Sequence, residues 1–203
     1  FLLYTPHVLR TPPPAIRGYA EARADGTLHD ADADDRKRAA TIIGSEGRRL
    51  ERLVRDLLEL ARLDAHEFSQ SPVACDATEV VRNAAEAFRP QATEHGIELN
   101  VASGGVLAVE LDPERVAQIV ANLIENALKY AASRVEVYAA PQGDAHIAIV
   151  VVDDGPGIPA EQAGRVFERL YTVRDTPGRA VGTGLGLAIV RELAAAPARK
   201  RVP

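Results

Sequence analysis

Hydrophobic residues recur at helical spacing through one long segment in the first third of the chain. Between residues 34 and 65, apolar residues return at intervals of three, four and seven, and charged residues occupy most of the positions between them. The principal apolar positions are Ile43, Leu50, Val54, Leu57 and Ala61. This spacing predicts one amphipathic helix about 48 Å long at ~1.5 Å per residue. Such a helix has to bury its apolar stripe, so we expect a helical hairpin that pairs with a second copy into a four-helix bundle.

The pattern changes after a short linker around Ser69 and Pro72, and helices then alternate with strands. Asp76 or Thr78 is suited to cap a helix over residues 76–88, and Pro113 to open a second helix, with a final helix over residues 185–196. Short apolar or alternating runs predict strands at residues 97–101, 106–109, 134–140 and 146–152. The chain is therefore expected to be α+β, with a helical hairpin followed by an α/β domain.

Composition limits the classes of protein that the chain can belong to. Its 203 residues fit one large domain or two small ones, and 46% of them are hydrophobic but only 4% aromatic. A net charge of -5 argues against a nucleic-acid partner. A single cysteine, Cys75, excludes an internal disulfide and suits a reducing compartment. No apolar run approaches the ~18 residues that span a bilayer. Because the chain begins at Phe1 and has no Met, we expect it to be a piece of a longer protein.

The second helix of the α/β part has a stripe of polar residues. Asn122, Asn126, Lys129 and Tyr130 fall on one helical face. Amide oxygens suit Mg²⁺, a lysine can neutralise phosphate charge, and a tyrosine ring can pack on a base or a sugar. The alternative is a solvated helix face without a ligand.

Two glycine-rich segments follow that helix. Asp153 ends an apolar strand, and Gly155 and Gly157 allow a tight turn beside it, so the carboxylate could accept a hydrogen bond from an exocyclic amine such as adenine N6. An ordinary Asp/Gly turn is the alternative.

The second segment contains Gly182, Thr183, Gly184, Leu185 and Gly186, immediately before the final helix. Its open backbone N–H groups and the helix dipole favour anions. It is neither a P-loop nor a dinucleotide fingerprint. Together with Asn122 and Asn126 upstream, the two glycine-rich segments predict a nucleotide pocket.

These motifs resemble those of a known family. The region from about residue 73 to 196 resembles the ATP-binding domain of two-component sensor histidine kinases, in the gyrase/Hsp90/histidine kinase/MutL superfamily. Residues 122–130 resemble its N box, 153–158 its G1 box, 182–187 its G2 box and 166–171 its F box. The resemblance implies the cofactors ATP and Mg²⁺.

The resemblance also assigns roles to single residues. Asn126 would be the Mg²⁺ ligand, with Asn122 one turn behind it. Lys129 would contact phosphates and Asp153 would bind adenine N6. Gly182, Gly184 and Gly186 would border the triphosphate, and residues 171–181 would form a lid over it.

The beginning of the chain resembles the H-box of the same kinases. By this resemblance His7 is the phosphorylation site, and Thr11 would orient water when the partner is dephosphorylated. The implied domains are a dimerisation and phosphotransfer domain over residues 1–68 and an ATP-binding domain over residues 72–196, followed by a disordered tail over residues 197–203. The implied partners are a second copy of the chain and the receiver domain of a response regulator, and the implied location is the cytoplasmic part of a membrane-anchored bacterial sensor, soluble as a fragment.

Three departures from the family pattern affect the expected activity. Val8 stands where the family has Glu or Asp, and it cannot accept the proton of His7, so autophosphorylation should be slower by as much as ~10²–10⁴-fold. Pro13 and Pro14 follow the expected Pro12 and should distort the helix. The tail replaces a final β-hairpin, so the sheet should lack two strands.

Other functions stay open beside the kinase. A degenerate member could act mainly as a phosphatase, and a noncatalytic dimerisation module could use only the long helix. A serine-directed kinase would lack the H-box, and gyrase-like or Hsp90-like ATPases use an acidic base where this chain has Asn122.

Overall fold

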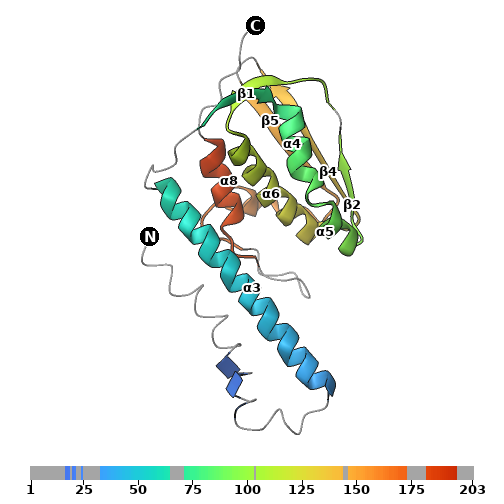
Figure 1. Ribbon diagram of the computed structural model, residues 1–203, viewed down its shortest axis with the longest axis vertical. Coiled ribbons are helices and arrows are strands. Elements are labelled where there is room, and N and C mark those ends of the chain that lie inside the picture. The colour runs from blue at the N-terminus through green and yellow to red at the C-terminus, as the bar shows by residue number, and fades with distance from the viewer. Residues whose placement is uncertain are drawn as a thin grey trace.

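The computed structural model describes residues 17–18, 20–21, 24, 33–64, 71–102, 104–143, 146–172 and 182–195 (Figure 1). Several features expected from the sequence lie outside these residues: His7, Val8, Thr11, Pro13 and Pro14, most of the lid segment, and the tail.

Helix α3, Ala33–Asp64, is the long amphipathic helix expected from the sequence, and its ends lie within one residue of the predicted ones. Asp34 and Asp35 are in its first turn and Arg62 is in its last turn, which matches the sign of the helix dipole at both ends. Leu53 and Leu60 are buried against the rest of the chain. Val54 and Leu58 are exposed, so α3 buries only part of its apolar surface within one copy of the chain.

The strands form two small sheets. Strand β1, Val73–Asp76, pairs antiparallel with β3, Ala108–Leu111. Strand β4, Arg134–Gln142, is the centre of the other sheet, with β2, Glu98–Val101, parallel on one side and β5, His146–Asp153, antiparallel on the other. Along β4 buried and exposed residues alternate, so one face of this sheet bears the core.

Helices α4, Ala77–Glu86, and α6, Pro113–Tyr130, cover that face, as Figure 1 shows. The fully buried core residues between them and the sheet are Val81, Val120, Ile124, Val135 and Val137. Helix α8, Gly186–Ala194, lies beside α6, and α3 lies against α8 on the side away from the sheet (Figure 1). A second apolar cluster fills this outer contact and joins α3 to the α/β part.

The helix expected over residues 76–88 is α4, which ends two residues earlier than predicted, and a further helix that was not predicted follows it. Helix α4 ends at Glu86, and a separate helix α5, Arg89–Glu94, begins with Pro90 in its first turn. A proline lacks the N–H that a continuing helix needs, but it is tolerated in a first turn, so the chain starts a new helix there.

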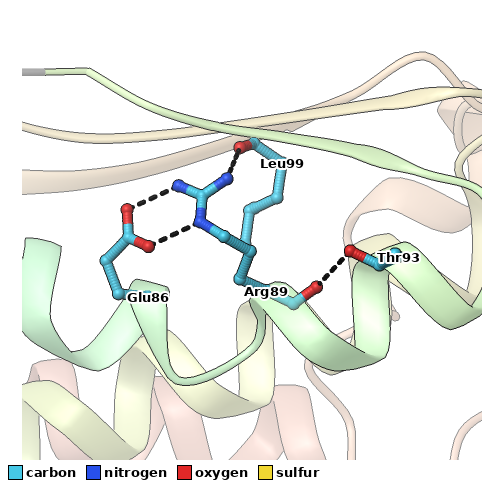
Figure 2. A network of polar contacts seen from close by, with 4 residues as sticks. All are labelled: Glu86, Arg89, Thr93 and Leu99. Carbon is cyan, nitrogen blue, oxygen red and sulfur yellow. Dashed lines mark hydrogen bonds and ion pairs between the residues drawn. The ribbon is translucent and has the colours of Figure 1, made fainter.

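Arg89 stabilises the corner between these two helices (Figure 2). Its guanidinium donates two hydrogen bonds to the Glu86 carboxylate, at 2.6 and 2.5 Å, and a third to the Leu99 carbonyl of β2, at 3.1 Å. Thr93 donates its hydroxyl to the Arg89 carbonyl at 2.9 Å. The Arg89 hydrogen bond holds the pKa of Glu86 below its usual value. One side chain thereby ties the α4–α5 corner to the sheet.

Strand boundaries differ from the prediction around residue 107. The strand expected at residues 106–109 is β3, Ala108–Leu111, and its partner β1 was not predicted. The Leu107 amide donates to the Asp76 carboxylate at 2.9 Å, and the Leu107 carbonyl accepts from the Ala77 amide at 2.9 Å. Leu107 therefore helps to cap α4, and the strand begins one residue later.

Candidate functional site

Helix α6 has the polar stripe expected from the sequence. Its first turn is fixed by Asp112, whose carboxylate accepts from the amides of Glu114 at 3.1 Å and Arg115 at 3.4 Å. The opposite face supplies core residues such as Val120 and Ile124. With the helix held between core and loops, Asn122 and Asn126 are half-buried on its other face.

A cavity of about 340 Å³ opens beside this stripe. Asn126 and Asp153 are its polar lining residues, from α6 and from the end of β5. Most of the lining is apolar and comes from α6, β5, the segment after β5, and α8. It includes Leu123, Val151, Ile158, Val166, Phe167 and Leu187. A mostly apolar cavity of this size with a carboxylate and an amide is suited to a flat organic group that bears a hydrogen-bond donor.

The turn after β5 brings Asp153 close to the end of α6. The Gly155 amide donates to the Asp153 carboxylate at 2.9 Å. A β-carbon added at Gly155 would be 2.5 Å from the Tyr130 carbonyl oxygen, so the two segments approach too closely for any side chain at this position. Gly157 has φ +74°, a left-handed conformation that glycine adopts without strain. Both glycines are therefore required by the turn geometry.

The neighbouring Asp154 has a structural role that the sequence did not indicate. Its carboxylate accepts from the amides of Ala132, Ser133 and Arg134, at 2.9, 2.9 and 3.0 Å, and from the Ser133 hydroxyl at 2.6 Å. The Ser133 hydroxyl and these amides lower the pKa of Asp154 strongly. Asp154 thus links the end of β5 to the start of β4.

The glycine-rich loop, residues 182–186, contacts α6 at two points. A β-carbon added at Gly182 would be 3.0 Å from Lys129 Nζ, and one added at Gly186 would be 3.0 Å from the Asn122 side-chain oxygen. Gly184 has φ +71°, and its carbonyl accepts from the Leu170 amide at 2.8 Å. The loop therefore lies along the polar stripe of α6, next to the ammonium group of Lys129.

The same loop also contacts α3. Thr183 donates its hydroxyl to the Asp56 carboxylate at 2.7 Å, and Leu185 is buried in the apolar cluster with Leu53 and Leu60. No pattern in the sequence pointed to Asp56 as part of this site. This contact joins α3 to the glycine-rich loop, two segments that no sequence motif links.

The structure gathers most of the predicted residues around one region. Asn126 and Asp153 line the same cavity. Lys129 and Asn122 lie next to the glycine-rich loop, and the backbone carbonyl of Tyr130 lies close to Gly155. The Lys129 ammonium is also 4.7 Å from the centroid of the Tyr130 ring. Sequence reasoning did not identify the apolar lining as part of the site, because its members come from several separate segments. Most of them, such as Leu123, Ile158 and Leu187, lie inside the motifs, but no role was assigned to them.

Two parts of the chain match protein-family models. Residues 111–200 match the histidine kinase-, DNA gyrase B- and HSP90-like ATPases, and residues 1–66 match the His Kinase A phospho-acceptor domain. Histidine protein kinase DivJ of Caulobacter vibrioides is 36% identical over 199 residues, which are 96% of this chain and 33% of DivJ. The chain belongs to the sensor histidine kinase family. Sensor histidine kinase WalK of Bacillus subtilis is 32% identical over 197 residues, 95% of this chain and 32% of WalK.

Solved histidine kinases share the fold of this chain. Full-length ShkA in complex with AMPPNP matches with a TM-score of 0.65 and 30% identity, over 92% of this chain and 39% of ShkA. ThkA in complex with the response regulator TrrA matches in fold with a TM-score of 0.72 and 22% identity, over 94% of this chain and 52% of that one. This histidine kinase chain spans about a third of the length of DivJ and WalK. Among its described helices, none combines the length and the apolar character needed to cross a membrane.

Proposed function

We propose that this chain is the kinase core of a sensor histidine kinase, which transfers the γ-phosphoryl group of ATP to His7 and then to an aspartate of a response-regulator receiver domain. The observation that carries the proposal is the cavity that Asn126 and Asp153 line together, beside the glycine-rich loop and Lys129. The matches to the phospho-acceptor and ATPase family models support the same assignment. ShkA was solved with AMPPNP, which supports a triphosphate in the corresponding position.

Each part of ATP has a suitable partner in this geometry. The adenine ring would occupy the apolar cavity, with its N6 amine donating to the Asp153 carboxylate. The triphosphate would extend toward the amides of residues 182–186, and Lys129 would balance part of its charge from the last turn of α6. Tyr130 would lie at the sugar side of the site.

The donor set around the cavity also fits Mg²⁺. The amide oxygen of Asn126 is a hard donor, and among the described residues no group of three or more His, Cys, Asp or Glu gathers into a metal site. Mg²⁺ commonly takes one or two protein oxygens and keeps phosphate oxygens and waters as its other ligands. Asn126 would therefore hold the ion, which would supply charge neutralisation on the triphosphate when bound.

The transfer itself would be a substitution at the γ-phosphorus. A neutral imidazole nitrogen of His7 would form the N–P bond as the bond from phosphorus to the bridging oxygen of ADP breaks, and the ring would then lose its other proton. Val8 cannot accept that proton, so it would pass to solvent and the step would be slow. The second transfer moves the phosphoryl group from His7 to the partner's aspartate and restores the neutral ring.

Two partners follow from this assignment. A second copy of the chain would cover the exposed apolar residues Val54 and Leu58 of α3, in a four-helix bundle. A response-regulator receiver domain would accept the phosphoryl group, and ThkA was solved in complex with such a partner. The assignment also implies the cytoplasmic part of a membrane-anchored bacterial sensor.

One sequence feature favours a second activity on the same scaffold. Thr11 follows His7 by four positions, where the resemblance places a residue that orients water for dephosphorylation of the partner. Because Val8 would slow the forward step, removal of the phosphoryl group from the response regulator would be a second activity of the chain.

The kinase assignment is tested by incubating the chain with γ-labelled ATP and Mg²⁺. We expect acid-labile label on the wild-type chain, loss of label in His7→Gln, and at least a tenfold lower rate in Asp153→Ala. Val8→Glu should raise the rate, because a carboxylate would then accept the proton of His7. Acid-stable label, or full labelling of His7→Gln, would refute the assignment of His7.

A further inference from the structure

Helix α3 meets the glycine-rich loop through a mixed apolar and polar contact. Leu53 and Leu60 pack against Leu185, Ile189 and Leu193, and Ile119 of α6 completes the cluster. Asp56 follows Leu53 by three positions and precedes Leu60 by four, so the three side chains share one helical face. Asp56 therefore lies on the side of α3 that packs against α8, where its carboxylate reaches Thr183.

The hydroxyl of Thr183 makes two hydrogen bonds at this contact. It donates its only proton to Asp56 Oδ2 at 2.7 Å, and it accepts from the Leu185 amide at 3.3 Å. The next residue, Gly184, is held on its other side by the amide of Leu170 at 2.8 Å. The loop is thus fixed at consecutive residues, by α3 at Thr183 and by the segment before the lid at Gly184.

The charge of Asp56 decides whether this contact helps or hinders an incoming triphosphate. Burial raises the pKa of Asp56, whereas the Thr183 hydrogen bond and the nearby Arg55 and Arg52 lower it. The positive charges of these two arginines, which lie on the same helix, therefore offset part of the negative charge of the carboxylate. Burial is the largest of these influences, so the pKa of Asp56 lies above its usual value. The Thr183 proton is directed toward α3, so Asp56 contacts the loop through that hydroxyl.

We propose that Asp56 is a positioning residue for the glycine-rich loop: by accepting the Thr183 hydroxyl it holds residues 182–186 in the conformation that receives the triphosphate. The part of this inference that concerns nucleotide affinity rests on the proposed function. A loop that is already ordered loses less entropy when the ligand binds, so the hydrogen bond should raise affinity. The helix of the phospho-acceptor segment would thereby contribute to nucleotide binding.

Two measurements on the whole chain test the proposal. The first is amide hydrogen exchange of residues 182–186 without nucleotide, and the second is the affinity for AMPPNP by calorimetry. We expect Asp56→Ala and Thr183→Val each to speed exchange and to weaken AMPPNP binding by about three- to tenfold, the size of one net hydrogen bond. Together they should weaken it little more than either alone, because both remove the same interaction.

Conservative and control variants separate positioning from general loss of structure. Thr183→Ser keeps the hydroxyl and should restore wild-type exchange and affinity. Asp56→Asn keeps an acceptor oxygen and should fall between wild type and Asp56→Ala. Glu51→Ala removes an exposed carboxylate from the same helix and should change neither measurement.

The outcomes distinguish this inference from the function on which it rests. Unchanged loop exchange in Asp56→Ala, or tighter AMPPNP binding in that variant, would overturn the positioning role; tighter binding would mean that Asp56 competes with phosphate. If wild type binds no AMPPNP but Asp56→Ala still speeds loop exchange, the positioning of the loop stands and the proposed function fails.

Discussion

Lys129 Nζ lies directly against Gly182, at a distance that would leave only 3.0 Å to a β-carbon added to the glycine. The lysine is in the last turn of α6, and the glycine is the first residue of the glycine-rich loop. A positive charge therefore stands beside the backbone of the glycine-rich loop. The arrangement favours an anionic group at this corner of the site over a neutral one.

We expect Lys129→Met to weaken binding of the phosphate groups without weakening binding of the base. Loss of one charge-assisted contact should weaken AMPPNP binding on the order of tenfold. Adenosine, which has no phosphate, should bind within about twofold of its wild-type affinity. Calorimetry with both ligands checks this, and an equal loss for the two would contradict a phosphate role for Lys129.

Gly184→Ala should destabilise the α/β part. Gly184 has φ +71°, and an added β-carbon would be 2.8 Å from the Leu170 carbonyl carbon and from the Tyr171 carbonyl oxygen. Because the close atoms belong to the backbone of Leu170 and Tyr171, the clash is relieved only if that backbone moves. We expect this to lower the free energy of unfolding by about 1–3 kcal/mol. Urea unfolding measures this free energy.

Gly47→Ala is the matched control for that substitution. Gly47 lies within α3, and an added β-carbon there meets nothing within 4 Å. Alanine is the better helix former by up to ~1 kcal/mol, so this variant should be slightly more stable than wild type. Equal destabilisation by the two substitutions would show that the steric argument for Gly184 is wrong.

Glu59 should make the stability of the chain depend on pH. Burial, and then the neighbouring Asp56, raise its pKa from 4.5 to about 7, against hydrogen bonding from Gln118 and the charge of Arg62. Its Oε1 is buried without a hydrogen-bond partner among the residues that the structure describes. Between about pH 4.5 and 7 the folded chain retains a proton that the unfolded chain has lost, so stability should fall as the pH rises through this window.

Glu59→Gln should remove most of that slope, because the pKa of Glu59 is raised furthest among these carboxyl groups. At pH 8 it should also be more stable than wild type, on the order of 1 kcal/mol, because position 59 then holds no charge. Chemical unfolding at several pH values gives both quantities. Glu51→Gln, at an exposed position of the same helix, should keep the wild-type slope; if Glu59→Gln keeps it as well, another group is responsible.

Asp154 should contribute stability of the opposite pH dependence. Its hydrogen bonds from Ser133 and the adjacent amides hold its pKa far below 3.8, so the stabilisation is complete above that pH and is lost as the pH falls below it. Asp154→Asn should lower the melting temperature at pH 7 and lose less stability on acidification than wild type. Glu136→Gln, exposed on β4, should change neither, and identical acid profiles for wild type and Asp154→Asn would contradict this role.

Periodicity and motif spacing predicted the elements whose pattern is long or chemically distinctive. Helix α3 has a sustained apolar stripe, and α6 has a row of polar residues on one face of an otherwise apolar helix. Both patterns could therefore be recognised in the sequence. Strand β1 has four residues and helix α5 has six, and neither shows such a pattern, so neither was predicted. Local pattern is weak evidence for elements this short.

The contact between Asp56 and Thr183 could not be predicted from the sequence for a different reason. The two residues are 127 positions apart, and their meeting depends on how α3 packs on α8. An aspartate within an amphipathic helix has the same sequence signature whether it faces solvent or a loop. The same holds for the cavity, because its apolar wall is assembled from several segments.

The apolar cluster between α3 and α8 has a practical consequence for anyone who dissects the chain. Leu185, Ile189 and Leu193 are each at most 3% exposed, and Leu53 and Leu60 of α3 are among the residues that cover them. A nucleotide-binding fragment that lacks α3 would expose these two leucines and the isoleucine to water as one continuous hydrophobic patch. Self-association or poor solubility of such a fragment would then be caused by the absence of α3. Substituting Ile189 alone would not restore solubility, because the two leucines would stay exposed.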